Sequence, residues 1–322
     1  MSDAPARLRL RVAAIADVAP RIRLFDLVHA EGAELPPFEA GAHLDIAIPG
    51  VEGRSYSLLN APAECHRYRI AVLREPQGRG GSAWMHEAVR VGDILEASPP
   101  ANHFPLAPAA ASHLLIGGGI GITPLMAMAE SLAAAGAEFH LHYCARAREE
   151  AGFADHLAAR HGPRLSLYFD GGDPARGLDI ATLLARKPPG GHVYVCGPAG
   201  MIRAVREAAR EWPEGTVHWE LFAADETVAP PPAPAGGFAV TLAKSGQTLQ
   251  VPADRPLLDV LRENGVRVKT MCRDGVCGTC RVTVLSGEVE HRDQVLTKAQ
   301  QAKFMQVCVS RAPPGATLVL DL

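Results

Sequence analysis

The sequence contains no long uninterrupted apolar run and no large excess of charge of one sign. Its longest apolar stretch, Leu114–Ile122, is broken by four glycines and is far shorter than the about 20 residues that a membrane helix needs. The net charge of the 322 residues is −3, which disfavours a nucleic-acid partner. No apolar segment follows a basic start, so we expect no signal peptide. These absences predict a cytoplasmic protein without membrane or nucleic-acid partners.

Cysteine is scarce too, and its distribution does not suggest a disulfide framework. Three of the seven cysteines are scattered through the chain: Cys65, Cys144 and Cys196. Scattered, unpaired cysteines are typical of a reducing compartment. The other four stand near the C-terminal end and carry the most specific pattern in the sequence.

These four cysteines have the spacing C-x4-C-x2-C, and the fourth follows after a gap of 27 residues. They are Cys272, Cys277, Cys280 and Cys308. This is the ligand spacing of plant-type [2Fe–2S] clusters. Structural zinc is the alternative, but zinc sites typically combine two C-x2-C pairs, or one such pair with two histidines. The sequence therefore favours an iron–sulfur cluster, with the backbone N–H groups of residues 273–279 as donors to its sulfurs and with Gly275 and Gly278 where the backbone must wrap around it.

The first hundred residues are predicted to form a small antiparallel barrel. Short alternating segments such as Leu8–Val12, Ile22–Val28 and Tyr68–Arg74 are separated by turn residues, among them Pro49 and Gly50. No helical stretch occurs before about Ser82. Strands at such short intervals are typical of a barrel.

Two segments of this predicted barrel carry groups suited to an aromatic, phosphorylated cofactor. In Arg54–Leu58 an arginine can hold a phosphate, a tyrosine can lie on a ring system, and a serine hydroxyl can bond a ring nitrogen. In Gly78–Ser82 a glycine-rich turn opens a predicted helix, whose N–H groups can bind an anion. Each segment also fits an ordinary strand or turn, so neither identifies a site by itself.

The middle of the chain alternates predicted strands and helices, which is typical of a parallel sheet with helices on both faces. One strand runs into the glycine turn Gly117–Pro124, where Thr123 suits the N-cap of a helix and Pro124 its first position. A later strand ends in Cys196–Pro198. Because ligands bind at the carboxyl ends of parallel strands, the two turns are predicted to line one crevice. Composition alone leaves Cys196 open between a site residue and a buried packing residue.

The glycine turn departs from the standard dinucleotide fingerprint. Gly117 and Gly119 match the first two positions of G-x-G-x-x-G, but Ile122 stands at the third. The next strand ends near Arg146 and Arg148 instead of at an acidic residue. The pattern therefore leaves the choice between NADH and NADPH open.

Residues 227–237 are rich in proline and glycine and are predicted to be a linker. After them the strand pattern returns, with one helix over Leu257–Glu263, so a small mixed sheet crossed by a helix is expected. From Gly237 onward there are eleven Lys or Arg and eight Asp or Glu, a local charge of +3. Lys269, Arg273 and Arg281 around the cysteine loop are either a generic solvated surface or a rim that docks an acidic partner.

The order and spacing of these motifs resemble the phthalate dioxygenase reductase family, the reductases of Rieske-type oxygenases, which includes vanillate O-demethylase reductases. The resemblance covers essentially the whole chain and rests on Arg54–Leu58, Gly78–Ser82, Gly117–Pro124, Cys196–Pro198, Gly215–Phe222 and the four cysteines. It implies an FMN-binding antiparallel β-barrel domain at residues 1–105 and a NAD-binding α/β domain with a parallel sheet at 106–226. After the linker it implies a [2Fe–2S] ferredoxin domain with an α+β β-grasp fold at 238–322.

The resemblance also implies roles for the residues at matching positions. The implied flavin contacts are Arg54, Ser55, Tyr56 and Ser57, with Gly80, Gly81 and Ser82 at the phosphate and Phe222 over the ring. The implied nicotinamide-cofactor residues are Gly118, Gly119, Gly121, Thr123, Cys196, Gly197 and Pro198. Ser57, beside the flavin, and Cys196 and Glu220, beside the nicotinamide, come closest to catalytic residues. Ala223 and Ala224 follow Phe222 where the family often has Gly-Ala. FMN in place of FAD rests mainly on the family and on the position of the ferredoxin domain at the end of the chain.

The combination predicts an oxidoreductase that carries electrons from NADH through FMN to the cluster and on to a separate Rieske-type oxygenase. NADH gives up two electrons as a hydride and the cluster accepts one, so a flavin is needed between them. Two alternatives are a reductase for a cytochrome P450 and a non-enzymatic iron–sulfur carrier or sensor with a degenerate nucleotide domain.

Overall fold

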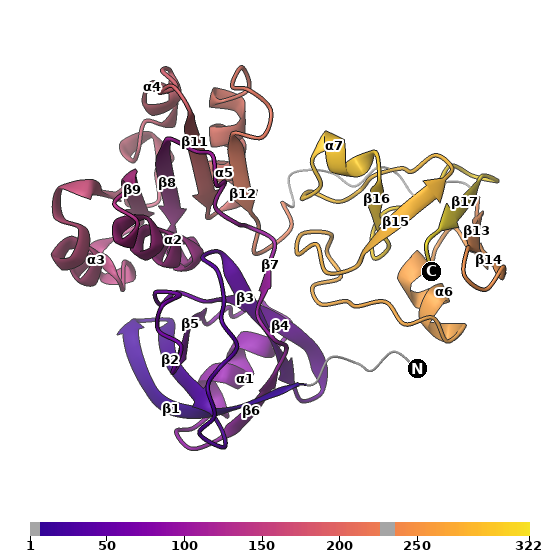
Figure 1. Cartoon of the computed structure of the whole chain (residues 1–322), viewed down its shortest axis with the longest axis horizontal. Helices are drawn as coiled ribbons and strands as arrows, with labels where there is room; N and C mark the ends of the chain where they lie inside the picture. The colour runs from indigo at the N-terminus through magenta and orange to yellow at the C-terminus, as the bar shows by residue number, and fades with distance from the viewer. Residues whose placement is uncertain (1–6, 226–235) are drawn as a thin grey trace. The chain divides into compact units, whose positions relative to one another are not determined.

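The computed structural model describes residues 7–225 and 236–322 (Figure 1). The chain divides into two compact units, Met1–Glu220 and Leu221–Leu322. The first unit contains two sheets and the second contains one. Of the predicted linker, residues 227–235 lie outside the described residues. The boundaries predicted at residues 105 and 226 stay predictions.

An antiparallel barrel forms the first part of the first unit and confirms the predicted fold. Its strands are β1 (Leu8–Ala19), β2 (Ile22–His29), β3 (Ala42–Ile48), β4 (Val51–Ser57), β5 (Tyr68–Leu73), β6 (Ile94–Ala97) and β7 (Ala101–Asn102). The order is β4-β3-β6-β1-β2-β5, with β7 beside β3, and an antiparallel bridge between Leu58 and Ile70 joins the two edges. Alternate residues fill the interior, including Leu10, Val12 and Phe25, all 0% exposed. Helix α1 (Gly81–Glu87) adds Met85 to this core.

The second part of the first unit is a five-stranded parallel sheet, also as predicted. Its strands are β8 (Ser112–Gly118), β9 (Glu138–Ala145), β10 (Leu165–Phe169), β11 (Gly191–Cys196) and β12 (Val217–Glu220), in the order β10-β9-β8-β11-β12. The connecting helices are α2 (Ile122–Ala134), α3 (Ala154–His161), α4 (Ile180–Leu184) and α5 (Ala199–Ala208), with short 3-10 turns η1 (Gly119–Gly121), η2 (Arg148–Glu150), η3 (Gly162–Arg164) and η4 (Pro174–Arg176). The strand order reverses between β8 and β11, so a crevice for a ligand is expected at their carboxyl ends.

The predicted start of α2 is wrong by two residues. The helix begins at Ile122, after the 3-10 turn at Gly119–Gly121, and its N-cap is Gly121 with no side-chain cap. Thr123 is 2% exposed and its hydroxyl donates to the Ile120 carbonyl at 3.0 Å. Pro124 is accordingly the third helical residue and not the first. The glycine turn already curls the chain, so no hydroxyl cap is needed.

The second unit is a mixed sheet crossed by a helix, which confirms the predicted β-grasp architecture. Its strands are β13 (Phe238–Leu242), β14 (Thr248–Val251), β15 (Arg281–Ser286), β16 (Phe304–Gln306) and β17 (Thr317–Leu320), in the order β14-β13-β17-β15-β16. Strands β13 and β17 are parallel and the other pairs are antiparallel. Helix α6 (Leu257–Glu263) buries Leu257, Leu258 and Leu261 in the core of this unit. A short helix α7 (Lys298–Gln301) precedes β16.

No helix within residues 7–225 and 236–322 is long and apolar enough to cross a membrane.

Candidate functional site

The cysteine loop lies between α6 and β15 and has an unusual backbone. Arg273, Gly275 and Gly278 have φ values of +62°, +73° and +75°. Alternation of left-handed residues with their neighbours turns successive N–H groups toward a common concave side, which suits an anionic group. A Cβ on Gly275 would lie 2.6 Å from Cγ2 of Val309, so this glycine also permits the loop to approach the segment of the fourth cysteine.

A backbone N–H group of the loop points at the sulfur of Cys272. The Asp274 N–H donates to Cys272 Sγ at 3.3 Å. The pKa of the Cys272 thiol falls to about 6, first because of its hydrogen bond with Cys277 and then because of backbone N–H groups, against the effect of burial. The same hydrogen bond raises the pKa of Cys277, so this pair favours a thiolate at Cys272 and a thiol at Cys277.

The four sulfurs form two pairs. Cys272 and Cys277 are hydrogen-bonded to each other, and Cys280 Sγ lies 3.0 Å from Cys308 Sγ. The Gly275 N–H donates to Cys308, which places the distant fourth cysteine at the loop. Among the described residues, no group of three or more His, Cys, Asp or Glu side chains converges where a single metal ion could sit. Two pairs of thiols fit a two-iron cluster, whereas a structural zinc ion needs four ligands around one point.

In the barrel, the two segments singled out from the sequence lie against each other. A Cβ on Gly81 would be 2.8 Å from Cγ and 3.2 Å from Nε of Arg54. Gly80 precedes it at a φ of +87°, and α1 begins at Gly81. The Ser82 hydroxyl accepts from the Glu75 N–H at 3.0 Å and keeps its own proton to donate. The Arg54 side chain thus lies against the glycine turn that begins α1, an arrangement that fits a phosphate.

The next residues of β4 differ in their surroundings. The Ser55 hydroxyl donates to Asp45 Oδ1 at 2.6 Å, so its side chain is held by the neighbouring strand β3. Tyr56 is half-buried, and its hydroxyl is buried without a hydrogen-bond partner among the described residues. Burial raises the pKa of Tyr56, and the charge of Arg54 opposes this. An unpartnered phenol beside this arginine fits a cofactor that supplies the missing partner.

The three residues closest to a catalytic role meet within the first unit. Cys196 and Glu220 are paired in register on β11 and β12, and Glu220 hydrogen-bonds Ser57 of the barrel. Glu220 is half-buried as a residue, but its Oε2 is buried and has no partner in the described chain. Burial of the carboxyl raises its pKa to about 8, and the bond to Ser57 opposes this. Cys196 is 0% exposed, and burial, followed by the charge of Glu220, raises its pKa well above the usual value.

The glycine turn after β8 and the turn after β11 are in direct backbone contact. A Cβ on Gly121 would lie 2.4 Å from the Cys196 carbonyl oxygen, and one on Gly118 would lie 2.6 Å from Pro198 Cδ. A Cβ on Gly197 would lie 3.0 Å from Gly118 Cα. Gly119 has a φ of +55° with open space around it. The structure therefore brings the two predicted turns together at the point where the strand order reverses.

Not every residue named from the sequence joins these groups. Thr123 directs its hydroxyl back into the turn, so only its backbone can face a ligand. Phe222 is 46% exposed and falls in the second unit, so its position over the flavin ring stays a prediction. At the end of β9, Arg146 is exposed, whereas Arg148 forms an ion pair with Asp155.

Sequence reasoning missed one buried histidine of the barrel. His43 is 4% exposed and pairs with Ser57 across β3 and β4. Its Nε2 lies 3.7 Å from Asp45 Oδ1, and burial lowers its pKa against the effect of Asp45. In the alternation of β3, His43 lies on the face opposite the core residues Leu44 and Ile46, so the sequence pattern gave no sign that this side chain is buried beside Ser57.

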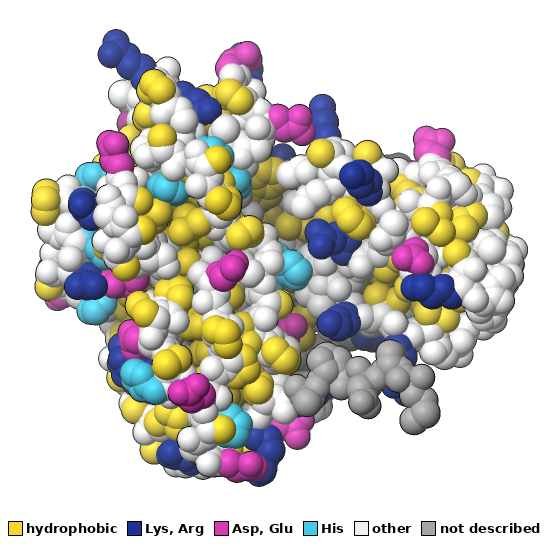
Figure 2. All heavy atoms as spheres, in the orientation of Figure 1, with side chains coloured by type: hydrophobic (Ala, Val, Ile, Leu, Met, Phe, Trp, Pro, Cys, Tyr) yellow, Lys and Arg dark blue, Asp and Glu magenta, His cyan; other side chains and the backbone are white. Residues whose placement is uncertain are grey.

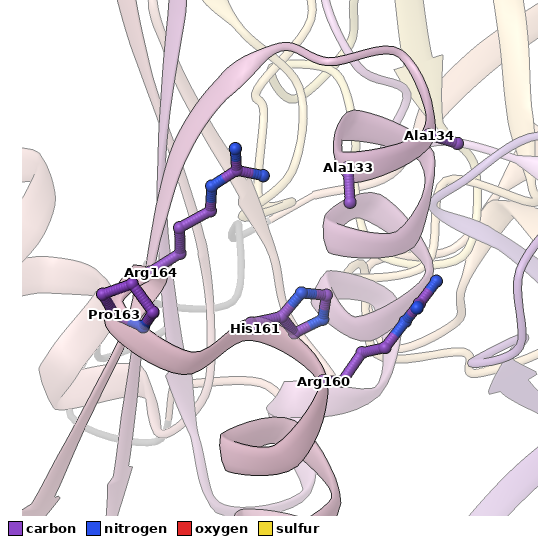
Figure 3. A pocket seen from close by; sticks show the side chains of 6 residues that line it. All are labelled: Ala133, Ala134, Arg160, His161, Pro163 and Arg164. Atoms are coloured by element: carbon purple, nitrogen blue, oxygen red, sulfur yellow. The ribbon is translucent and has the colours of Figure 1, made fainter.

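A surface hollow at the far end of α2 is separate from these turns (Figure 3). Ala133 and Ala134 face Arg160, His161, Pro163 and Arg164 there. Arg160 pairs with Glu130 at 2.8 Å, and the Arg164 guanidinium stacks on Phe139 at 5.1 Å. Because these cations already have partners, we assign the hollow no role.

Comparison with known proteins identifies both the last unit and the whole chain. Residues 240–313 match the family described as a 2Fe-2S iron-sulfur cluster binding domain. The phthalate dioxygenase reductase of Burkholderia cepacia is 43% identical over 317 residues, 98% of this chain and 97% of that protein.

Several solved structures match nearly the whole chain, and two of them bear on its function. One is a phthalate dioxygenase reductase, described as a modular structure for electron transfer from pyridine nucleotides to [2Fe–2S]. It has 42% identity and a TM-score of 0.73 over 98% of both chains. The other is an intact type IV self-sufficient cytochrome P450 monooxygenase, with 39% identity and a TM-score of 0.88. It matches 98% of this chain, which corresponds to 41% of that longer chain. The relatives are reductase components of oxygenase systems, and the chain is an oxidoreductase of this kind.

Proposed function

This chain belongs to the phthalate dioxygenase reductase family, and we propose that it carries electrons from NADH through FMN to a plant-type [2Fe–2S] cluster and on to a Rieske-type oxygenase. The partner would hydroxylate or O-demethylate an aromatic compound. The observation that carries the proposal is the 98% coverage of both chains in the match to a phthalate dioxygenase reductase structure. We propose the domain boundaries 1–105, 106–226 and 238–322 on the same ground.

The barrel offers the groups that would hold FMN. Arg54 and the turn at Gly80 and Gly81 would bind the phosphate, because a guanidinium side chain lies against the turn that begins α1. Tyr56 would give its hydroxyl to the cofactor, since no residue that the structure describes is a partner for it. When bound, FMN takes a hydride and releases electrons one at a time.

The pair of Ser57 and Glu220 would control a proton beside the flavin. With a pKa of about 8, Glu220 is mostly protonated at pH 7. A protonated carboxyl can donate to Ser57, whose hydroxyl can then donate onward to a ring nitrogen. Cys196 stays a neutral thiol beside them. The three side chains therefore carry little charge and can hold or pass a proton at Ser57 Oγ.

The two backbone turns would orient the nicotinamide cofactor. Gly118, Gly121 and Gly197 leave no room for side chains, so backbone groups can approach the cofactor closely. Glu220 and Cys196, at the ends of the adjacent strands, would lie beside its reactive ring. NADH, as opposed to NADPH, is proposed from the family.

The surface around the cysteine loop would dock an acidic face of the partner. Of the three cations named from the sequence, Arg273 forms an ion pair with Asp259 at 2.6 Å, and Arg281 is exposed and stacks on Phe304. Lys269 is exposed. Figure 2 shows Lys and Arg side chains outnumbering Asp and Glu on the visible face of this unit. Complementary charge would mainly speed the encounter.

Anaerobic titration tests this proposal. The purified protein should contain FMN, two irons and two sulfides, and NADH should bleach the flavin and the iron–sulfur absorbance together. A cluster that stays oxidised while the flavin is reduced would contradict the proposed path. Stopped-flow mixing of the reduced protein with a Rieske-type oxygenase should then show rapid reduction of the oxygenase cluster.

The similarity to a self-sufficient P450 favours a second candidate partner. In that structure an equivalent of this chain is joined to a cytochrome P450 monooxygenase. If the reduced protein reduced a P450 haem much faster than any Rieske cluster, the P450 would be the better assignment. A non-enzymatic carrier is disfavoured, because the phosphate cradle, both backbone turns and the Ser57–Glu220 pair are all present.

A further inference from the structure

A fully buried glutamine lies against one of the two sulfur pairs. Gln306 is the last residue of β16, pairs with Arg281 of β15 and is 0% exposed. Its Oε1 accepts a hydrogen bond from the Cys280 thiol at 3.0 Å. Its Nε2 is buried and has no hydrogen-bond partner in residues 7–225 and 236–322.

Packing does not explain this side chain. The surrounding core of the second unit is apolar and includes Met305 and Val307 on either side in sequence. A leucine or methionine would fill a similar volume without an unsatisfied amide. Within the part of the chain that the structure describes, the partner of the amide is Cys280, a cysteine of the proposed cluster. An effect on the sulfur of Cys280 would account for a buried amide at this position.

The hydrogen bond must change when Cys280 binds iron. A ligating cysteine is a thiolate and has no proton to donate. The Oε1 lone pairs would then face a negative sulfur, whereas the amide N–H groups would be attracted to it. A half-turn about the last side-chain torsion exchanges oxygen and nitrogen at almost the same positions, and this torsion is soft. The exchange also gives the unpartnered Nε2 an acceptor.

We propose that Gln306 donates an N–H···S hydrogen bond to Cys280 in the cluster-loaded protein and so raises the reduction potential of the cluster. Reduction adds one negative charge to the cluster. A donor aimed at a ligand sulfur stabilises the reduced form more than the oxidised form. The inference rests on the proposed function, because it requires a plant-type cluster at these cysteines.

Spectroelectrochemical titration of Gln306→Leu tests the proposal. Loss of one hydrogen bond should lower the equilibrium constant for one-electron reduction about fivefold. At 59 mV per tenfold this is a midpoint about 40 mV lower. The matched control is Met305→Leu, which changes the neighbouring residue of β16, also 0% exposed, and should leave the midpoint unchanged. An unchanged midpoint in Gln306→Leu, or an equal shift in both variants, would overturn the proposal.

A second measurement does not depend on a variant that folds. In wild-type protein with nitrogen-15 in the glutamine side chains, pulsed electron paramagnetic resonance of the reduced cluster should detect a coupled amide nitrogen. Its absence would also overturn the role of Gln306. Iron and sulfide analysis distinguishes a failure of the proposed function from a failure of the role proposed for Gln306. Wild-type protein without a [2Fe–2S] cluster would overturn the proposed function together with this inference, whereas a loaded protein without the coupling overturns the inference alone.

Discussion

The pKa of Glu220 leads to a stability change that pH should reveal. An ordinary glutamate ionises near 4.5, whereas burial raises the pKa of Glu220 in the folded protein to about 8. Between these values the folded chain holds one proton more than the unfolded chain. Stability therefore falls as pH rises through this window and is constant above it.

The replacement Glu220→Gln removes this dependence, because an amide resembles the protonated acid at every pH. Each pH unit inside the window changes the free energy of unfolding by about 1.4 kcal/mol. Relative to pH 4.5, the variant should gain about 2 kcal/mol at pH 6 and about 4 to 5 kcal/mol at pH 8. For a unit of this size 1 kcal/mol corresponds to about 2 to 4 °C. The gain in melting temperature should thus be about 10 °C or more at pH 8 and about half that at pH 6.

The assay is thermal unfolding of the cofactor-loaded protein and its variants from pH 4.5 to 8.5. Buried histidines with lowered pKa values, such as His142 and His218, are common to all the proteins and cancel in the difference. Glu138→Gln, at an exposed glutamate of the same sheet, is the matched control and should give a difference that does not change with pH. A difference between Glu220→Gln and wild type that stays constant from pH 5 to 8 would refute a buried, protonated carboxyl.

Three further predictions follow from the geometry. Gly121→Ala should raise the KM for NADH at least about tenfold, because its Cβ would lie 2.4 Å from a carbonyl oxygen. Gly200→Ala, with nothing nearer than 3.7 Å, should leave the KM unchanged, and an equal effect of both would contradict the steric argument. Arg54→Ala should weaken FMN retention at least about tenfold in equilibrium dialysis. The control Arg21→Ala, at an exposed arginine, should retain FMN as the wild type does. Unchanged retention in Arg54→Ala would contradict the assignment of Arg54 to the phosphate. The rate of electron transfer to the oxygenase should fall several-fold between about 50 and 300 mM salt, and Lys269→Gln should make that rate less dependent on salt. A rate that does not change with salt would exclude electrostatic steering by Lys269, Arg273 and Arg281.

Regular patterns allowed most of the fold to be predicted from the sequence. Short alternating strands indicated the barrel, strand–helix alternation indicated the parallel sheet, and the spacing of four cysteines indicated the ferredoxin unit. The sequence singled out the glycine turn because glycines let a pyrophosphate approach the backbone, whereas the structure shows that the glycines at 118, 121 and 197 also let the two turns touch each other. Such features depend on local chain geometry, which is determined by residues that are close together in the sequence.

Features that depend on distant neighbours were not predictable in this way. A glutamine in a run of apolar residues gives no sign that its amide meets Cys280, because that contact depends on the pairing of β15 with β16. The start of α2 was misplaced because a threonine before a proline resembles a cap, while the preceding 3-10 turn had already begun the helix. His43 likewise needed the register of β3 and β4 before its proximity to Ser57 became visible.

The two units favour opposite protonation states of their key side chains: protonated groups in the first unit and a thiolate in the second. We relate this difference to the number of electrons that each unit would transfer. In the first unit, burial keeps Glu220 protonated and Cys196 a thiol, so a hydride can be exchanged beside groups that keep their protons. In the second unit, the hydrogen bond with Cys277 and then backbone N–H groups lower the pKa of Cys272 and favour its thiolate. A cluster held by such thiolates would take up one electron without needing a proton. Under the proposed function, Glu220 would control a proton at the two-electron step and N–H donors would act at the one-electron step, which would account for the carboxyl of Glu220 lying in the first unit and the amide of Gln306 in the second.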